Sequence, residues 1–137
     1  RARAYAARLN LPLAIVDKRR PQANEAEVMN VIGDIEGHNV LMFDDMIDTA
    51  GTLCGGMQAI LDRGARDIYA CATHGIFSAD AHKRLQDSPI RKVIVTDSIP
   101  QKTDGVLNKL EVVSVAPLLA DAILRVHRNQ SVSALFD

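Results

Sequence analysis

The residues best suited to chemistry lie in one short string, VLMFDDMIDTAGTL, at positions 40–53. Four apolar residues end in two acids, Asp44 and Asp45, and a short loop then reaches Thr-Ala-Gly-Thr at the expected start of a helix. A helix start exposes unpaired backbone N–H groups and the positive end of the helix dipole, and both attract anions. The string therefore predicts an anion site next to a pair of carboxylates.

The residue types in the loop indicate which ligand this site would suit. Gly51 lets the backbone approach a ligand closely, and the hydroxyls of Thr49 and Thr52 can donate to phosphate oxygens. The acids would repel that phosphate, so they suit neutral donors nearby, such as vicinal sugar hydroxyls, or a bound cation. Neighbouring strand residues point to opposite faces, so Asp44 and Asp45 should not face the ligand equally. The pattern fits a phosphorylated sugar.

A pair of acids before a helix also has a purely structural interpretation, in which the acids cap the helix and favour its dipole. That interpretation is the better one for an isolated Asp-Asp pair, because short motifs often occur by chance. For the whole string at 40–53, the combination of acids, glycine and two threonines favours a phosphate site instead.

A second candidate is the basic run Lys18-Arg19-Arg20-Pro21, which follows an apolar segment at 12–16 and opens a polar stretch at 18–27. Cations in a loop long enough to close over a site can stabilise negative charge that develops in a transition state. An isolated Lys-Arg-Arg would instead be interpreted as a solvated basic surface.

The remaining reactive residue types point away from zinc or thiol chemistry. The sequence has no cysteine–histidine constellation, so any metal is expected to be Mg²⁺ held by oxygen ligands and phosphates. His74 could line the rim of the pocket or have a packing role, and none of the four histidines is expected to be catalytic. Cys54 and Cys71 lie in apolar periodic segments and are expected to be buried, reduced thiols, as in a cytoplasmic protein.

Composition narrows the classes of partner. The net charge is −1, and only 4% of the residues are aromatic, with no Trp, which argues against a general nucleic-acid or membrane-surface binder. No apolar run is long enough to span a bilayer. A length of 137 residues suits one domain.

The elements that must position these residues alternate along the chain. Strands are expected at 12–16, 28–33, 40–43, 68–73, 93–96 and 112–115, and helices at 1–9, 52–63, 79–86 and 117–128. Such alternation of apolar runs with helices favours a parallel sheet with both faces covered. Ligands of these sheets lie beyond the carboxyl ends of the strands, here after residues 16, 43, 73, 96 and 115. The polar segment 97–109 is expected to protrude as a loop.

The string at 40–53 resembles the phosphoribosyl pyrophosphate motif shared by type I phosphoribosyltransferases and ribose-phosphate pyrophosphokinases, and its form DDMIDTAGT is most similar to the pyrophosphokinases. Segments similar to that family run the whole length of the chain in the family's order: IVDKRRP at 15–21, EVMNVIGDIEG at 27–37, YACATHG at 69–75, VTDSIP at 95–100, SVAPLLADAI at 114–123 and SVSALF at 131–136. The resemblance implies an α/β, type I phosphoribosyltransferase-type fold. Residues 1–137 would be a C-terminal, ribose 5-phosphate-binding domain, and the chain is expected to start within a longer protein.

The resemblance also implies a reaction. The complete protein would transfer the diphosphoryl group of Mg-ATP to the anomeric hydroxyl of ribose 5-phosphate, giving phosphoribosyl pyrophosphate and AMP, and this fragment alone would be inactive. Lys18 and Arg20 would stabilise the transition state from a mobile catalytic loop. The residues implied to bind ribose 5-phosphate are Asp44, Asp45, Asp48, Thr49, Ala50, Gly51 and Thr52.

Other features of the family lie at or beyond the ends of the chain. The family's metal-binding Asp-x-Gly-Gly segment is expected immediately before Arg1. The family's ATP-binding residues and a metal-ligating histidine are expected on an N-terminal domain. The tail residues Ser131, Val132 and Phe136 resemble part of an allosteric phosphate and ADP site at a subunit boundary, or they form a simple docking tail. The full-length protein is expected to be a cytoplasmic homo-hexamer.

Two alternatives to the pyrophosphokinase stay open. A type I phosphoribosyltransferase, which transfers ribose phosphate to a base, would need a base-recognising hood and is not expected to carry the KRRP loop. A non-catalytic pyrophosphokinase-associated or regulatory homologue would keep the fold, but the intact Lys18, Arg20 and DDMIDTAGT argue against decay of the site.

Overall fold

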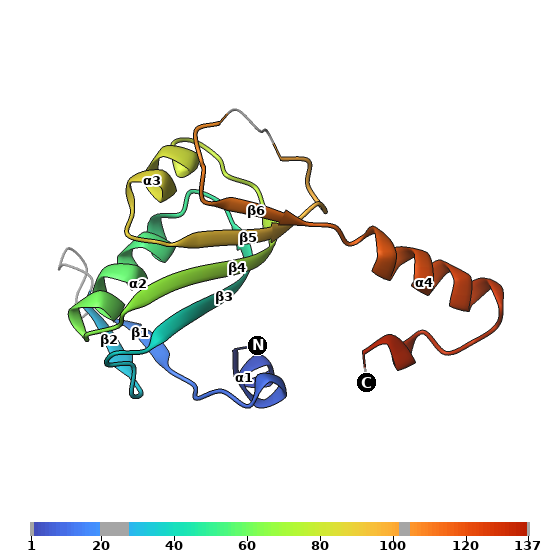
Figure 1. The fold of residues 1–137 in the computed structure, drawn as a ribbon, viewed down its shortest axis with the longest axis horizontal. Helices are drawn as coiled ribbons and strands as arrows, with labels where there is room; N and C mark the ends of the chain where they lie inside the picture. The colour runs from blue at the N-terminus through green and yellow to red at the C-terminus, as the bar shows by residue number, and fades with distance from the viewer. Residues whose placement is uncertain (1, 20–27, 102–104, 137) are drawn as a thin grey trace.

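The fold is built around a four-stranded parallel sheet, seen in a computed structural model that describes residues 2–19, 28–101 and 105–136 (Figure 1). Helices α2 (Gly51–Asp62) and α3 (Ala81–Asp87) lie between successive strands of this sheet. The strands pair in the order β3 (Asn39–Ile47), β4 (Asp67–Gly75), β5 (Lys92–Thr96) and β6 (Leu110–Val113). The predicted α/β class and the parallel sheet flanked by helices are confirmed.

The core lies between one face of the sheet and the two helices α2 and α3. Successive side chains of a strand point to opposite faces, so every second residue of a strand can enter this core. The core-facing strand residues are Ile68, Ala70, Ala72, Val93 and Val95, and the helices contribute Met57, Ile60 and Leu85. This packing holds the carboxyl end of β3 next to the start of α2.

The opposite face of the sheet is only partly covered, so the prediction that both faces are buried is wrong. Helix α1 (Ala2–Leu9) lies beside β3, where the ring of Tyr5 stacks on Phe43 with centroids 4.3 Å apart. On the same face, Leu41 remains exposed and Tyr69 is only half-buried. An apolar run in a strand predicts burial, but burial also needs a helix to lie over it, and among the described residues only α1 lies over this face.

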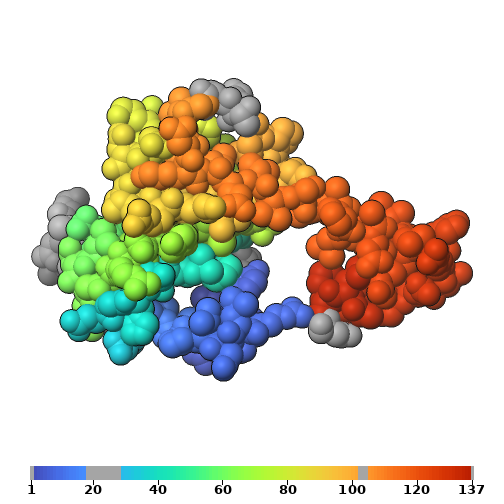
Figure 2. Space-filling model, viewed as in Figure 1, coloured from blue at the N-terminus to red at the C-terminus, as the bar shows by residue number. Residues whose placement is uncertain are grey.

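Helix α4 (Ala116–His127) extends beyond the carboxyl end of β6, apart from the sheet (Figures 1 and 2). None of its residues is buried, and Ile123 and Val126 are among its exposed apolar side chains. The chain then turns back through a short 3₁₀ helix, η1 (Ser133–Leu135), and Arg8 Nη2 donates to the Phe136 carbonyl at 3.1 Å. No helix in the described part of the chain is long and apolar enough to cross a membrane.

The first two predicted strands form an antiparallel pair of their own, β1 (Ile15–Arg19) and β2 (Val28–Ile32). They do not extend the parallel sheet, so the strand-end rule for parallel sheets does not apply after residue 16. A short apolar run fits either kind of sheet, and only contacts with the rest of the chain decide which strand it pairs with. Strand β2 packs on α2, where the Met29 methyl lies 2.9 Å from the position that a Cβ on Gly55 would take.

Strand β3 is longer than its apolar run, so Asp44 and Asp45 lie within the strand instead of following it. The neighbouring strand accounts for this extension, because β4 runs to Gly75 and supplies backbone partners as far as Ile47. Backbone pairing does not depend on the polarity of the side chains. The other predicted boundaries differ by a few residues at most, with β6 starting at Leu110 in place of 112.

Residues 97–101 and 105–109, the described parts of the predicted loop, arc away from the sheet between β5 and β6 (Figure 1). The first part is tied to β4, because Gln101 Nε2 donates to the Gly75 carbonyl at 2.8 Å. The last part is tied to α3, where Lys109 Nζ donates to the carbonyls of Gln86 and Ser88 at 2.8 and 2.7 Å. The predicted protruding loop is therefore anchored at both ends.

Asp97, at the carboxyl end of β5, joins that strand to the start of α4. Its carboxylate accepts a hydrogen bond from Ser114 Oγ at 2.5 Å and another from the Val115 N–H at 2.8 Å. These two bonds lower the pKa of Asp97. A carboxyl whose pKa is lowered by folding stabilises the fold above its ordinary pKa, and this contribution disappears as pH falls through the lowered value.

Replacing Asp97 by Asn is therefore expected to lower the thermal unfolding temperature at pH 7 and to have a smaller effect below about pH 4, near the ordinary pKa of an aspartate. Thermal unfolding of both proteins between pH 7 and pH 3 measures this. Asp34→Asn, in an exposed loop, is the control. An equal difference at pH 7 and pH 3 would contradict the electrostatic origin of the effect.

Candidate functional site

The two acids lie at the carboxyl end of β3 in different surroundings. Asp44 is exposed, and its Oδ1 accepts a hydrogen bond from the Asp45 N–H at 2.8 Å. Asp45 is half-buried, and its Oδ1 accepts from the Met46 N–H at 3.0 Å. The two acids therefore differ in exposure and in hydrogen bonding, although both border the same pocket, and their unequal roles toward a ligand stay a prediction.

This pocket has a volume of about 250 Å³ and lies where β3, β4 and α1 meet. The parallel pairing of β3 with β4 brings Thr73 and His74 beside the acids. His74 Nδ1 lies 2.9 Å from Ser98 Oγ, which orients the ring. The lining residues are Tyr5, Phe43, Asp44, Asp45, Thr73 and His74. Carboxylates, a hydroxyl and aromatic faces together suit a ligand that is rich in hydroxyl groups.

Sequence reasoning found only part of this lining. Thr73 ends the predicted strand at 68–73 and His74 follows it, so the strand-end rule points to both, and His74 alone is considered for the rim of the pocket. Tyr5 carries no local signal, because its place depends on how α1 packs against β3, where it stacks on Phe43.

Residues 48–52 form the turn from β3 into α2. The N-cap of α2 is Ala50, whose φ of 59° lies in the left-handed region, and no side chain caps this helix. The first helical hydrogen bond runs from the Cys54 N–H to the Ala50 carbonyl at 2.9 Å. The backbone N–H groups that precede this bond have no partner within a helix and are suited to an anion. The interpretation of the two acids as helix caps is wrong, because Ala50 occupies that position.

The side chains around the turn are accessible. Asp48, Thr49, Gly51 and Thr52 are all exposed, whereas Ala50 is buried. Two residues that sequence reasoning missed fasten the turn from outside: Ser78 Oγ donates to Asp48 Oδ1, and Arg84 Nη1 donates to the Thr49 carbonyl at 2.7 Å. Neither gave a signal in the sequence, because both act across gaps of 30 residues or more.

The two predicted catalytic cations are only partly within the described structure. Lys18 lies in β1 with its backbone opposite Met29, so the prediction that it lies in a loop is wrong. Arg20 lies outside the described residues. Met29, the backbone partner of Lys18, packs on Gly55 in the N-terminal half of α2.

The three tail residues lie away from the turn at 48–52. The Ser131 carbonyl accepts from Arg125 Nη1 at 3.2 Å, and the Val132 carbonyl accepts from the Leu135 N–H at 3.0 Å. Phe136 is 62% exposed. The tail therefore packs with α4 and, through the hydrogen bond of Arg8, with α1.

Two further features bear on cofactors and on cysteine chemistry. Within the described residues, no group of three or more His, Cys, Asp or Glu side chains could hold a metal ion. The carboxylate oxygens of Asp44 and Asp45 are nevertheless the donor type that Mg²⁺ prefers. Cys54 and Cys71 are free and half-buried, and burial raises the pKa of both thiols.

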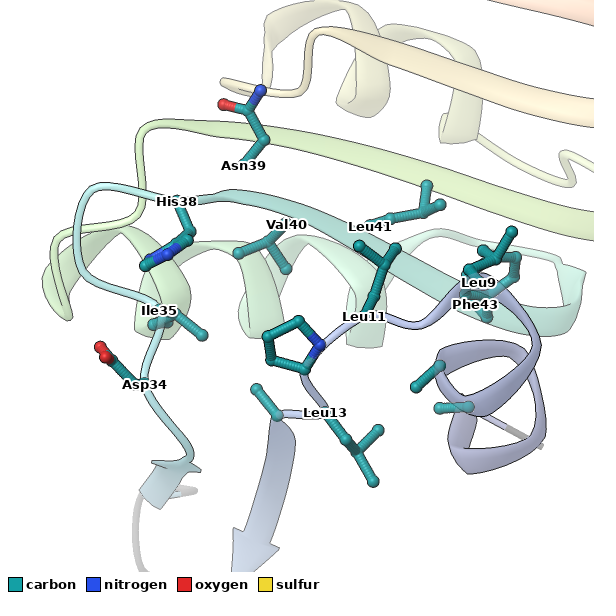
Figure 3. A pocket seen from close by; sticks show the side chains of 14 residues that line it. Leu9, Leu11, Leu13, Asp34, Ile35, His38, Asn39, Val40, Leu41 and Phe43 are labelled. Carbon is teal, nitrogen blue, oxygen red and sulfur yellow. The ribbon is translucent and has the colours of Figure 1, made fainter.

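A separate pocket of about 210 Å³ lies between α1 and the first half of β3 (Figure 3). Leu9, Leu11, Leu13, Ile35 and Val40 are among the side chains around it. Its lining is mainly apolar, and it lies toward the amino end of β3, whereas the acids lie toward the carboxyl end. This pocket does not suit a sugar phosphate.

Comparison with known proteins places these features in a family. Residues 20–137 match the family described as the phosphoribosyl synthetase-associated domain. The chain is 57% identical over 136 residues to a ribose-phosphate pyrophosphokinase of Caldanaerobacter subterraneus subsp. tengcongensis, and 48% identical over 136 residues to one of Bacillus subtilis. Each match covers 99% of this chain and 43% of the relative, so the chain spans less than half the length of these relatives.

A solved structure agrees with these matches. The crystal structure of phosphoribosylpyrophosphate synthetase from Mycobacterium smegmatis is similar with a TM-score of 0.84 and 38% sequence identity. The similarity covers 94% of this chain and 42% of that chain.

Proposed function

Because the chain belongs to the ribose-phosphate pyrophosphokinase family, we propose that it is the ribose 5-phosphate-binding part of an enzyme that makes phosphoribosyl pyrophosphate and AMP from Mg-ATP and ribose 5-phosphate. The observation that carries the proposal is the juxtaposition of a carboxylate-lined pocket and the uncapped N-terminus of α2, both at the carboxyl end of β3. A sugar phosphate has hydroxyls that suit the carboxylate-lined pocket and a phosphate group that suits the N-terminus of α2.

In this proposal the phosphate lies at the turn 48–52. The N–H groups at the start of α2 and the hydroxyls of Thr49 and Thr52 donate to its oxygens. The sugar hydroxyls donate to the carboxylates of Asp44 and Asp45. This division of roles keeps the negative charges of the acids away from the phosphate, and it fixes the ribose at both ends.

The transfer step moves a diphosphoryl group. The anomeric oxygen of ribose 5-phosphate attacks the β-phosphorus of ATP, the bond from that phosphorus to the oxygen bridging to the α-phosphorus breaks, and AMP leaves with that oxygen. Reactions of this kind depend on positioning and on cations that offset the charge of the phosphoryl oxygens. Lys18 and Arg20 supply that charge from the protein, and Mg²⁺, when bound, offsets the charge of the ATP phosphates.

Further parts of the proposal concern the complete protein. The binding residues for ATP and the principal ligands of Mg²⁺ lie outside this chain, so residues 1–137 alone bind ribose 5-phosphate without turnover. The complete protein is a homo-hexamer of the cytoplasm, and the tail with Ser131, Val132 and Phe136 contributes to an allosteric anion site. The identities of 48% to 57% with proteins named pyrophosphokinases support this activity over that of a type I phosphoribosyltransferase.

Binding of ribose 5-phosphate to the full-length protein in the absence of ATP tests the proposal. Thr52→Ala removes one donor to the phosphate and is expected to weaken binding about tenfold or more, as for the loss of a hydrogen bond to a charged group. Titration calorimetry measures the affinity. Ser88→Ala is the control, because the Ser88 hydroxyl donates to the Leu85 carbonyl at the end of α3 and does not line the pocket.

Unphosphorylated ribose provides a second control, since it lacks the group that the turn is proposed to bind. We expect ribose to bind far more weakly than ribose 5-phosphate, and Thr52→Ala to leave that weak binding unchanged. Equal affinities of the wild-type protein for the two sugars would refute the phosphate site.

A further inference from the structure

We propose that Arg84 is a positioning residue for the phosphate-binding turn, which it holds in shape from α3 through the Thr49 carbonyl. This inference rests on the proposed function, because it concerns how the same turn is made ready for ribose 5-phosphate. Arg84 does not belong to any of the segments that the sequence suggested for this site.

The last residue of β3 and the first two residues of the turn are held by residues 76–84, which follow β4. The N–H groups of Ile76 and Phe77 both donate to the Ile47 carbonyl, at 2.9 and 3.1 Å. Ser78 Oγ donates to the carboxylate of the next residue, Asp48. Arg84 Nη1 then donates to the carbonyl of the residue after that, Thr49, at 2.7 Å. The path of the chain from β3 to the start of α2 is therefore set by residues 76–84.

The bond from Arg84 orients a peptide group within the turn. The Thr49 carbonyl and the Ala50 N–H belong to one planar, trans peptide unit, so they point in opposite directions. A guanidinium that draws the carbonyl toward α3 consequently turns the Ala50 N–H away from α3. An unrestrained carbonyl could rotate toward a bound anion and repel it, and a fixed one cannot.

The conformation of Ala50 shows why such a restraint is needed. Its φ of 59° is rarely adopted by residues other than glycine, so the turn would relax if its neighbours did not hold it. Ala50 is 5% exposed, so the packing around its methyl group restrains it. The hydrogen bond from Arg84 to the Thr49 carbonyl restrains the preceding peptide unit. Both restraints therefore act on the backbone around Ala50.

Arg84 also brings positive charge to the turn. Its Nη1 lies 3.4 Å from the position that a Cβ on Gly51 would take, so the guanidinium lies directly beside the proposed anion site. Its charge also reaches the first turn of α2. Burial raises the pKa of Cys54 there, and the positive charge of Arg84 partly offsets that rise. A cation there favours a doubly charged phosphate over a neutral ligand.

The full-length protein with Arg84→Gln tests this inference. Gln is uncharged, and its shorter side chain carries a weaker donor, so we expect the affinity for ribose 5-phosphate to fall about tenfold to a hundredfold, the loss typical of a charge-assisted hydrogen bond. The KM for ribose 5-phosphate should rise by a similar factor while kcat changes much less, because the turn binds the substrate and the transition state alike. Arg84→Lys, which keeps the charge but lacks the planar fork, should lie between the wild-type protein and Arg84→Gln.

Lys83→Gln is the matched control. It makes the same change of charge on the adjacent residue of α3, where Lys83 pairs with Asp87 at 2.5 Å on an exposed surface. We expect this variant to keep the wild-type affinity and KM. Thermal unfolding of all variants shows whether Arg84→Gln remains folded at the assay temperature. If it does not, the KM of Arg84→Lys for ribose 5-phosphate tests the inference, and a wild-type value would overturn it.

The outcomes separate this inference from the proposed function. Tight binding of ribose 5-phosphate by the wild-type protein and equally tight binding by Arg84→Gln would overturn the positioning role and leave the phosphate site intact. A fall in unfolding temperature with unchanged affinity would overturn it too, since Arg84 would then only tie α3 to the turn. No binding by the wild-type protein would refute both.

Discussion

Replacing Lys18 or Arg20 by Ala in the full-length protein is expected to lower kcat about a hundredfold to a thousandfold, the effect of removing one preorganised donor from a transition state. The KM values for ATP and ribose 5-phosphate should change little. Interactions made mainly in the transition state lower kcat when they are removed, whereas contacts made equally in the ground state raise KM. Steady-state kinetics with each substrate varied in turn measures both.

The backbone of β1 at Lys18 lies opposite Met29, which packs on the N-terminal half of α2. Lys92→Ala is the control, because Lys92 is an exposed cation that pairs with Glu111 at 2.6 Å. If Lys18→Ala turned over at nearly the wild-type rate, the basic run would be an ordinary solvated surface and the proposed transfer step would lose its cations.

The second large effect concerns stability. Leu85→Ala is expected to cost about 2–5 kcal/mol of unfolding free energy, the usual range for a large apolar side chain removed from a core. Leu85 is fully buried between α3 and the sheet, so its removal leaves a cavity among close-packed neighbours. Ile123→Ala, on α4, is expected to change stability by less than about 0.5 kcal/mol, because Ile123 is 69% exposed.

Chemical denaturation of the two variants and the wild-type chain measures the difference. The comparison also tests which helices belong to the core. A loss for Ile123→Ala as large as that for Leu85→Ala would mean that α4 packs on the sheet in solution, in contrast to its extended position in Figure 1.

The sequence by itself determined the α/β class, the approximate position of each helix and strand, and the turn at 48–52. These features depend on local periodicity and on short motifs such as the glycine and threonines around the start of α2. The same local information identified Asp44 and Asp45, although it ended their strand too early. It also yielded the resemblance to the pyrophosphokinases, which the comparisons confirm.

Only the tertiary structure decided which segments meet. The pairing of β1 with β2, the open face of the sheet and the place of Tyr5 on Phe43 all depend on contacts between distant segments, which periodicity does not encode. The same holds for Arg84: nothing near it in the sequence marks it, yet it donates to the Thr49 carbonyl 35 residues away. A hydrogen bond of this kind depends on the path of the whole chain, because α3 must first pack on the sheet before its arginine can reach the turn.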